Sequence, residues 1–552
     1  MLRIFVVLFL LWSLLVFGLY GQDDGQNGGI VIFDGGTHVF DLSLHSTFFM
    51  GMTARSRNFG NSVSSSVFDA HLVSMNPAGM SRHKSNLLTF DVSPSFDFEV
   101  NDIVVSNFIR FSPRAELDTT IDSVIDEHYV GEEDAIYPDV TTRLGQTGGL
   151  NQIGIIVYDE KWGAFGFSWH RPFHLNMGYI SNGTNLSAEN IDEITEERTV
   201  EIYGQTITYE GTIETKTVLP LSMELFTNTT ISMHQSDFAY SRSFGEHFAL
   251  GGGFNVSNFT AKSSLRTKID GSLSQSITPF TPLGDLSEFE YVYSISFNDP
   301  NVSYYDRNTM DSKIDMDFQG IFVGGVFATN WQPSPKWNFD LVYDTPRSAD
   351  LRGSLHIVQN KMDVLNLSAG ATENILDTAA LIDDFETYAT RVQYVSDAVS
   401  MTLPGKLAIS TAWVPSDWRM IVSYEHFFGD IGIDYSAKRY EDGLHIDITG
   451  DPEYYERTPV DINYKIGLKP KHTIKMAIGS SHFAMSGQVT IADMIADGIT
   501  DSAGEQIVPA KNIIIPGLAF GATLSLSKTI SMDMSVVAIP APILRGSLSW
   551  KF

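Results

Sequence analysis

The feature that most constrains the fold of this chain is a strict two-residue alternation of apolar and polar side chains. It is clearest in 88–100, where one face carries Leu88, Phe90, Val92, Phe96, Phe98 and Val100. Successive side chains of a β-strand point to opposite sides, so this period predicts strands with one apolar face. Comparable segments occur at 148–158, 163–175, 230–242, 247–259, 314–326, 337–345, 401–413, 417–427, 461–468, 473–480, 513–527, 530–539 and 543–552. The alternation predicts an all-β protein of about fourteen strands.

The segments between these strands alternate in length. Tight turns are predicted at 159–162, 243–247, 332–336, 414–417, 469–472 and 526–529. Long polar loops are predicted near 101–147, 181–225, 262–312, 352–398, 434–459 and 484–512. Short turns at one end and long loops at the other are typical of a transmembrane antiparallel β-barrel. A soluble sandwich also alternates, but loops of this length and regularity are unusual in one.

The two ends of the chain carry export signals. Arg3 precedes an apolar run over 4–17, followed by Gly18 and Gly21, which predicts a signal peptide over 1–21. The alternative is a membrane-anchor helix, although the run is shorter than the roughly 20 residues such a helix prefers. At the other end, 543–552 alternates and finishes in Trp550-Lys551-Phe552. This ending resembles the signal that barrel assembly machinery reads in bacterial outer-membrane proteins, and it implies that location.

Composition excludes several function classes. The chain of 552 residues carries 36 Lys and Arg against 66 Asp and Glu, a net charge of -30, which argues against nucleic acid as a partner. It has no cysteine, so disulfides, thiolate metal sites and cysteine nucleophiles are excluded. The 14 histidines show no metal-ligand spacing, and no phosphate-binding loop precedes a helix. We therefore expect that the protein is not an enzyme and that it has no catalytic residues, no metal and no cofactor.

Residues 22–86 differ from the rest because they do not alternate. The run 64–75 predicts a short helix that ends at Asn76, since Pro77 disfavours helical geometry in the residue before it. A barrel of about fourteen strands has a lumen too wide for its own side chains to fill. We therefore expect 22–86 to fold into the barrel formed by 87–552 as a hatch, or plug.

Several motifs resemble one family, the FadL-type outer-membrane transporters of long-chain fatty acids and other hydrophobic compounds. They are Asn76-Pro77-Ala78-Gly79 at the end of the hatch, the strand pair at 403–430, and the segments 247–256 and 462–470. The resemblance implies a fourteen-stranded barrel with an N-terminal hatch and passive uptake of a hydrophobic small molecule. It also implies capture in an external loop groove, binding in a pocket against the hatch, and lateral or periplasmic release.

Candidate site residues follow from this resemblance. The ligand pocket would be formed by hatch residues Phe48, Phe49, Met50, Met52 and Phe59, although these side chains could serve only to pack the hatch against the wall. The family has a kink in its third strand, here 163–175, that opens a lateral exit toward the bilayer. Arg171-Pro172 is the candidate for this kink and lateral opening, because proline removes a ladder donor. Alternatively, Pro172 simply ends the strand.

The remaining candidates concern the head group and the loops. Alternation predicts that Lys406, Arg419, Lys465, Lys475 and Arg545 face the lumen. Of these, Lys406 and Arg419 are candidates for a carboxylate head group, and most of the others would pair with wall carboxylates. A loop groove would use Phe280, Phe289, Ile382 and Phe385. The rival interpretation is a barrel embedded in outer-membrane lipid that acts as an interaction or scaffold protein without transport.

Overall fold

The computed structural model describes residues 29–34, 37–46, 53–60, 62–100, 141–146, 148–202, 205–278, 291–296, 312–365, 386–446, 452–497, 511–539 and 543–552. The predicted signal peptide 1–21 lies outside these ranges. Among the described residues, no helix is both long enough and apolar enough to cross a membrane.

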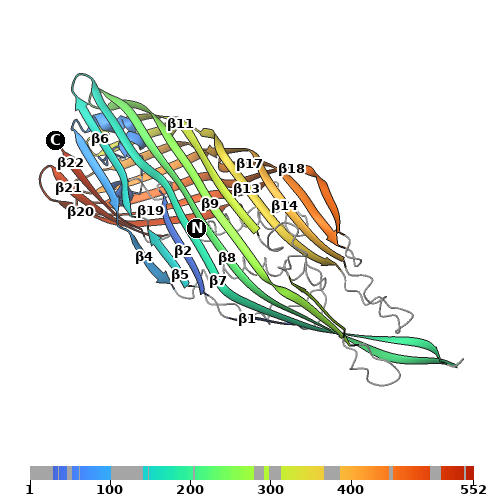
Figure 1. The fold of residues 1–552 in the computed structure, drawn as a ribbon. Helices are drawn as coiled ribbons and strands as arrows, with labels where there is room; N and C mark the ends of the chain where they lie inside the picture. The colour runs from blue at the N-terminus through green and yellow to red at the C-terminus, as the bar shows by residue number, and fades with distance from the viewer. Residues whose placement is uncertain are drawn as a thin grey trace.

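The described strands form one closed antiparallel barrel (Figure 1). Its first half contains β3 (Leu87–Ser93), β4 (Phe96–Val100), β5 (Thr141–Gln146), β6 (Gly149–Asp159), β7 (Gly163–Ile202), β8 (Gln205–Phe244), β9 (Phe248–Thr278) and β11 (Ser312–Ser334). The second half contains β12 (Trp337–Asp344), β13 (Arg347–Leu365), β14 (Glu386–Leu403), β15 (Gly405–Trp413), β16 (Arg419–Phe428), β17 (Ile431–Ile446), β18 (Pro452–Gly479), β19 (Phe483–Asp497), β20 (Ile513–Ser525), β21 (Ile530–Ile539) and β22 (Ile543–Lys551). The last strand, β22, pairs with β3 and closes the ring.

The predicted number of wall strands is confirmed. The pairs β3/β4, β5/β6, β12/β13, β14/β15 and β16/β17 each form one wall strand that is interrupted between its two elements, which gives fourteen. Three further strands are β1 (Gly29–Asp34), β2 (Thr37–Ser46) and β10 (Tyr291–Ser296). Of these, β10 extends the β9 edge, whereas β1 and β2 pair with β7.

Several strand boundaries were predicted wrongly. The supposed turn 469–472 lies inside β18, where a register shift between Pro470 and His472 absorbs the proline. The supposed loop 484–512 begins with β19, a strand that was not predicted. The two strands predicted at 461–468 and 473–480 are the single strand β18, so the two errors cancel in the total. Strands also run into the predicted loops 181–225, 262–312, 352–398 and 434–459.

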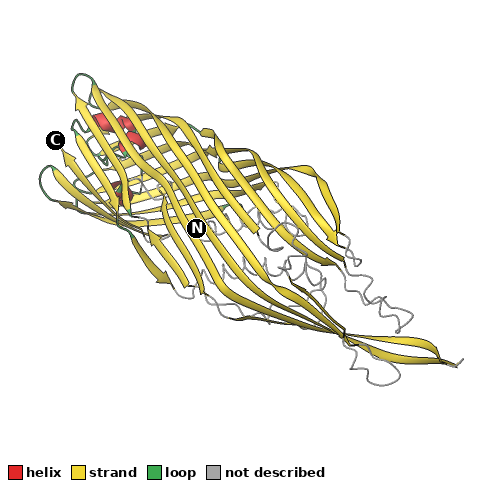
Figure 2. Ribbon diagram, viewed as in Figure 1, coloured by secondary structure: helices red, strands yellow, loops and turns green. Residues whose placement is uncertain are grey.

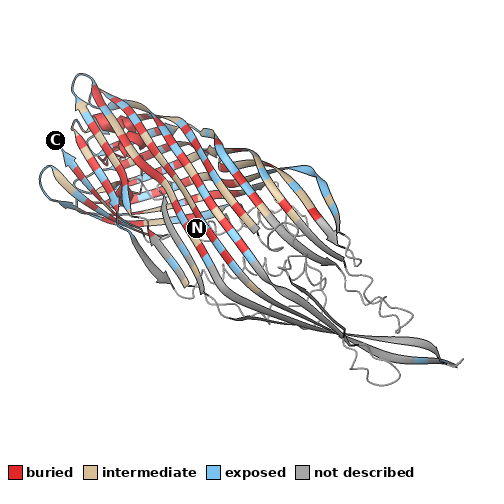
Figure 3. Cartoon of the chain, in the orientation of Figure 1, coloured by how far each residue is buried: buried red, intermediate tan, exposed pale blue. Residues whose placement is uncertain are grey.

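The outward faces of the wall strands form an apolar belt. Buried and exposed positions alternate along the coloured parts of the wall strands in Figure 3, and many of the exposed side chains are large and apolar. Exposed tryptophans gather where the short turns lie: Trp162, Trp331, Trp337, Trp413 and Trp418. An apolar belt edged by aromatic residues is the surface that a barrel presents to lipid.

Within the predicted hatch 22–86, the described residues 53–60 and 62–86 lie inside the barrel (Figure 2). They contain α2 (Ala54–Asn58), α3 (Leu72–Met75) and the 3₁₀ helix η1 (Pro77–Arg82). Their contacts reach well-separated wall strands: Ser65 N donates to Asp340 Oδ2 of β12 at 2.9 Å, and Asn58 Nδ2 donates to the Met534 carbonyl of β21 at 3.1 Å. We call this segment the hatch from here on. In contrast, β2, which was expected to belong to it, lies in the wall.

The helix predicted over 64–75 is only partly formed. It ends at Asn76 as expected, but only Leu72–Met75 is α-helical. The serines at its predicted start bind the backbone locally, since Ser64 N donates to Ser62 Oγ at 2.9 Å and Ser66 N donates to Ser64 Oγ at 3.3 Å. Such bonds compete with helical ones and favour a turn instead.

Candidate functional site

The inner wall carries an unusual apolar surface, and β11 shows how it arises. Near the short turns the outward face of β11 is apolar, with exposed Ile321, Val323 and Phe327. Toward Ser312 the outward positions become polar: Lys313, Asp315, Asp317 and Gln319. Over this second stretch the buried inward positions are apolar: Ile314, Phe318 and Phe322. The apolar face of the strand thus moves from the outside of the barrel to the inside.

In β7 a bulge produces the same inversion. Phe165 is 50% exposed on the outside, whereas Leu175 is 5% exposed and lies inside. The pairing with β8 shifts register between His170 and Phe173, at Arg171-Pro172. One extra residue reverses the facing of every residue beyond it. The prediction that 163–175 presents one continuous outward face is therefore wrong beyond the bulge.

The inward apolar residues on these stretches of β7 and β11 belong to one packed cluster. Its buried members are Leu175, Met177, Tyr179, Leu225, Met233, Phe259, Ala261, Leu265, Ile314, Phe318, Phe322, Leu351, Leu355, Ile357, Val399, Met401 and Leu403. We call this set the inner apolar lining. On the outside of the same wall, exposed ion pairs join Lys262 to Asp317 at 3.0 Å and Lys313 to Asp315 at 2.6 Å. On β9 and β11 the wall here is polar outside and apolar inside, the reverse of the lipid-facing belt.

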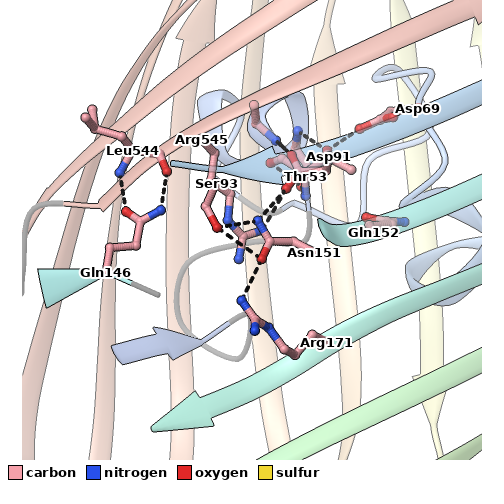
Figure 4. Close-up of polar contacts among 12 residues, drawn as sticks. Thr53, Asp69, Asp91, Ser93, Gln146, Asn151, Gln152, Arg171, Leu544 and Arg545 are labelled. Atoms are coloured by element: carbon pink, nitrogen blue, oxygen red, sulfur yellow. Dashed lines mark hydrogen bonds and ion pairs between the residues drawn. The ribbon is translucent and has the colours of Figure 1, made fainter. Parts of the chain in front are cut away.

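A polar network joins the hatch to four wall strands, β3, β6, β7 and β22 (Figure 4). Buried Asp91 of β3 accepts a hydrogen bond from Ala54 N of the hatch at 2.8 Å and lies 3.4 Å from Arg545 Nη1 of β22. Asn151 of β6 donates to Asp91 Oδ1 at 3.3 Å and accepts from Arg171 Nη2 at 3.1 Å. The network therefore connects the hatch directly to the residue beside Pro172.

Two buried guanidinium groups lie at this network. The guanidinium of Arg57, on α2, is 1% exposed and has no hydrogen-bond partner among the described residues. Burial and the nearby Arg545 guanidinium hold the pKa of Arg57 well below its ordinary value, and Asp91 partly offsets them. A buried guanidinium without a hydrogen-bond partner among the described residues favours a nearby anionic group.

The Asn76-Pro77-Ala78-Gly79 motif fixes the hatch to the wall. Asn76 Nδ2 donates to the Val63 carbonyl at 2.6 Å and to Asp340 Oδ1 of β12 at 2.9 Å. Pro77 and Ala78 press against Gly251 of β9, where an added Cβ would lie 2.4 Å from Ala78 N. The motif is therefore a docking element in this structure.

Phe59 and Arg419, two candidate ligand contacts, lie against each other. Phe59 is 3% exposed and packs with a cluster that includes Ile421 and Ala477 of the wall. The Arg419 guanidinium lies 5.8 Å from the centroid of the Phe59 ring. Both side chains thus join the hatch to the wall, which is the packing alternative considered for Phe59.

The structure places Lys406 beside a wall carboxylate. Its Nζ lies 3.6 Å from Glu425 Oε1, and Lys475 Nζ lies 2.7 Å from the same oxygen. Pairing with a wall carboxylate is the role expected of most inward basic residues, whereas the head-group role of Lys406 stays a prediction. The other eight pocket and groove candidates lie outside the described residues: Phe48, Phe49, Met50, Met52, Phe280, Phe289, Ile382 and Phe385.

Ser74, His170 and Asp237 are the residue types of a hydrolase triad and lie together, but they are not arranged as one. Ser74 Oγ donates to Asp237 Oδ2 at 2.7 Å, and His170 Nδ1 lies 3.1 Å from the same oxygen. A nucleophilic serine needs a base as its acceptor, whereas here both groups bind the carboxylate. Among the described residues, no group of three or more His, Cys, Asp or Glu side chains is arranged to hold a metal ion.

Sequence reasoning found some of these residues and missed others. Alternation placed Arg545 inside, because it lies opposite the outward Leu544 and Leu548 of the last strand. It gave no signal for Arg57, which lies in the non-alternating hatch. It also could not reveal the inner apolar lining, because a strand with apolar residues on either face looks the same in sequence.

Several solved structures of bacterial proteins are similar to this chain over most of its length. The Ralstonia pickettii toluene transporter TbuX is 10% identical, with a TM-score of 0.39, over 91% of this chain and 98% of that one. The Pseudomonas putida toluene transporter TodX is 10% identical, with a TM-score of 0.37, over 90% and 97%. A Pseudomonas aeruginosa FadL homologue is 12% identical, with a TM-score of 0.38, over 91% and 98%.

Neither protein-family models nor curated protein sequences give a match to this chain. The functional conclusion below therefore rests on the residues of this chain.

Proposed function

We propose that this protein is a channel of the bacterial outer membrane for passive uptake of long-chain fatty acids or similar hydrophobic compounds. The observation that carries the proposal is the inner apolar lining, which lies beyond the lipid-facing belt in a wall with a polar exterior. A water-filled porin would need polar side chains there. An apolar interior instead lets the alkyl chain of a ligand leave water and contact apolar side chains.

The energetics suit extraction of an amphiphile from water. Each methylene moved from water to the lining gains about 0.8 kcal/mol, so a long alkyl chain gains enough to leave solution. Its carboxylate would meet the buried guanidinium of Arg57 in the hatch, which has no hydrogen-bond partner among the described residues. Arginine binds a carboxylate through two parallel hydrogen bonds. The ligand would enter from the loop end and leave laterally or toward the periplasm.

A second candidate is a barrel that serves as an interaction or scaffold protein. It is favoured by the paired strands β7 and β8, which run together for 40 residues each as far as the pair Ile202 and Gln205. In Figure 1 their ends project from the barrel as a long arm. Such a protein would need no apolar interior, so ligand binding separates the two candidates.

The test is a titration of detergent-purified protein with a fluorescent long-chain acid, using two neighbouring substitutions. Phe318 points into the lining, whereas Gln319 is its exposed neighbour on the opposite face. We expect Phe318→Gln to raise Kd about tenfold or more, because about 1.5–3 kcal/mol of apolar contact is lost. Gln319→Ala should leave Kd unchanged. Absence of saturable binding in the unsubstituted protein would favour the scaffold candidate.

A further inference from the structure

The wall strand formed by β16 and β17 is interrupted between these two elements. Direct pairing of β16 with β18 ends at His426 with His472, and pairing of β17 with β18 begins at Ile431. The pairing of β18 with its other neighbour, β19, shifts register at the same level, between Pro470 and His472. The backbone ladder is therefore broken directly beside the His426–His472 pair.

Both histidines of this pair face the outside of the barrel. Tyr424 and Phe428, two residues before and after His426, are each 41% exposed, whereas Glu425 is buried on the inside. Successive side chains of a strand point to opposite sides, so His426 shares the outer face with the two aromatic residues. Its cross-strand partner His472 lies on the same face, because directly paired residues point to the same side.

The histidine pair lies at the edge of the lipid-facing belt. Toward the short turns, the outward residues of β16 and β18 are apolar and exposed: Met420, Val422, Ile474, Met476 and Ile478. Toward the other end of the wall, Lys471 Nζ and Asp493 Oδ2 form an ion pair at 2.8 Å. The two imidazoles therefore lie at the boundary between the apolar and the charged outer surface, within reach of dissolved ions.

Three donor atoms converge at this boundary. His426 Nδ1 lies 3.2 Å from His472 Nδ1, and Tyr424 Oη lies 2.7 Å from the same nitrogen of His472. The centroids of the two imidazoles are 5.0 Å apart, so the rings lean toward each other at their Nδ1 edges. Two nitrogens at tetrahedral positions around one Zn²⁺ lie roughly 3.3 Å apart. The spacing of the two imidazole nitrogens is therefore that of a metal chelate.

Hydrogen bonds alone satisfy only one of these two close contacts. Each nitrogen of a neutral imidazole carries either one hydrogen or one lone pair in the ring plane. His472 Nδ1 can therefore form a good hydrogen bond with Tyr424 or with His426, but not with both. A cation between the three atoms satisfies all of them, because each donor then directs a lone pair toward the same centre.

We propose that Tyr424, His426 and His472 form a binding site for a divalent transition-metal ion, Zn²⁺ or Cu²⁺, on the outer surface of the barrel. Imidazole ligands suit these ions, whereas Ca²⁺ and Mg²⁺ take oxygen ligands. The bound ion would hold β16 to β18 beside the point where their backbone pairing ends.

The sequence gave no sign of this site. The expectation of no metal rested on spacing along the chain, whereas His426 and His472 are 46 positions apart and are brought together by strand pairing. The inference goes beyond the proposed function and does not depend on it, because the site lies on the outside of the wall.

Titration with the metal alone tests the site. Protein purified in detergent without a histidine tag is titrated with Zn²⁺ by calorimetry, and we expect saturable binding. His426→Asn and His472→Asn should each weaken it by about 100-fold or more, because a ligand is lost rather than an outer-shell partner. The matched control, His482→Asn, removes an exposed histidine from the turn between β18 and β19 and should leave the affinity unchanged. Heat-modifiable migration on gels reports whether each variant is folded.

Two further measurements identify the ligands and the effect of the ion. Electron paramagnetic resonance of the Cu²⁺ form should show two coordinated nitrogens in the unsubstituted protein and in Tyr424→Phe, but one in either His426→Asn or His472→Asn. Zn²⁺ should raise the thermal midpoint of the unsubstituted protein, with reversal by a chelator, because it binds the folded state. The midpoint of His426→Asn should not respond. Absence of Zn²⁺ binding to the unsubstituted protein, or equal affinity in all folded variants, would overturn the proposal.

Discussion

At the scale of single residues, small side chains and buried polar contacts decide how the hatch sits in the barrel. Gly251 of β9 leaves room for the backbone at Pro77-Ala78, and Asp340 of β12 accepts hydrogen bonds from both Ser65 N and Asn76 Nδ2. These contacts are specific to position, since the neighbouring Gly252 has no atom closer than 3.5 Å to an added Cβ. The triple glycine at 251–253 is therefore a docking surface for the hatch at its first position.

The two glycines provide a matched test of hatch docking. Gly251→Ala would place a Cβ 2.4 Å from Ala78 N, and this backbone cannot move without shifting the hatch. We expect a loss of about 1–3 kcal/mol of stability from overpacking, measured as a lower thermal midpoint of the folded band on semi-native gels. Gly252→Ala meets only ordinary contacts and should lower the midpoint much less. Equal effects would mean that Gly251 is not a docking position.

At the scale of elements, the wall strands differ in what they bury. On the inside of β16 and β18, Glu425 and Lys475 form an ion pair in which each side chain is 3% exposed. On the outside of β9 and β11, Lys262 and Asp317 form a pair with side chains 67% and 62% exposed. Buried and exposed pairs of the same charge type respond differently to the loss of one partner, because only the buried charge is left without water.

This contrast gives a prediction for the strand pair β16–β18. Glu425→Gln leaves Lys475 and Lys406 without their shared carboxylate, and we expect a loss of about 3–5 kcal/mol in unfolding free energy. Asp317→Asn on the outside should cost about 1 kcal/mol or less. Both are measured by urea unfolding in detergent, followed by tryptophan fluorescence. A Glu425→Gln protein as stable as the Asp317→Asn protein would contradict the burial of this pair.

At the scale of the whole molecule, a wide barrel is occupied by its own N-terminal segment. The hatch contacts β8, β12 and β21, which lie well apart around the ring. In Figure 2 its helices lie within the barrel near the end that carries the short turns. Ions crossing the barrel must therefore pass the hatch.

Conductance measures this obstruction directly. In planar bilayers we expect the unsubstituted protein to conduct weakly, because hatch side chains fill the cross-section that a fourteen-stranded ring leaves open. Deletion of 53–86 should give large, stable channels if the remaining barrel assembles, which heat-modifiable migration on gels reports. A large conductance of the unsubstituted protein would show that the hatch does not obstruct the barrel.

Much of this architecture was predictable from the order of residues. Alternation and turn spacing gave the number of wall strands, and the final strand 543–552 appears as β22 within one residue. The end of the second hatch helix at Asn76 followed from Pro77. The long extensions of β7 and β8 were missed, because the segment 181–225 was interpreted as a polar loop.

The sequence by itself determined a lipid-facing barrel with a non-alternating N-terminal segment, because a period of two and the absence of that period are local properties. Only the tertiary structure decided which face of each apolar strand points inward and that β2 lies in the wall. Those outcomes depend on a bulge at Arg171-Pro172 and on pairing between residues more than a hundred positions apart, and no local pattern records either.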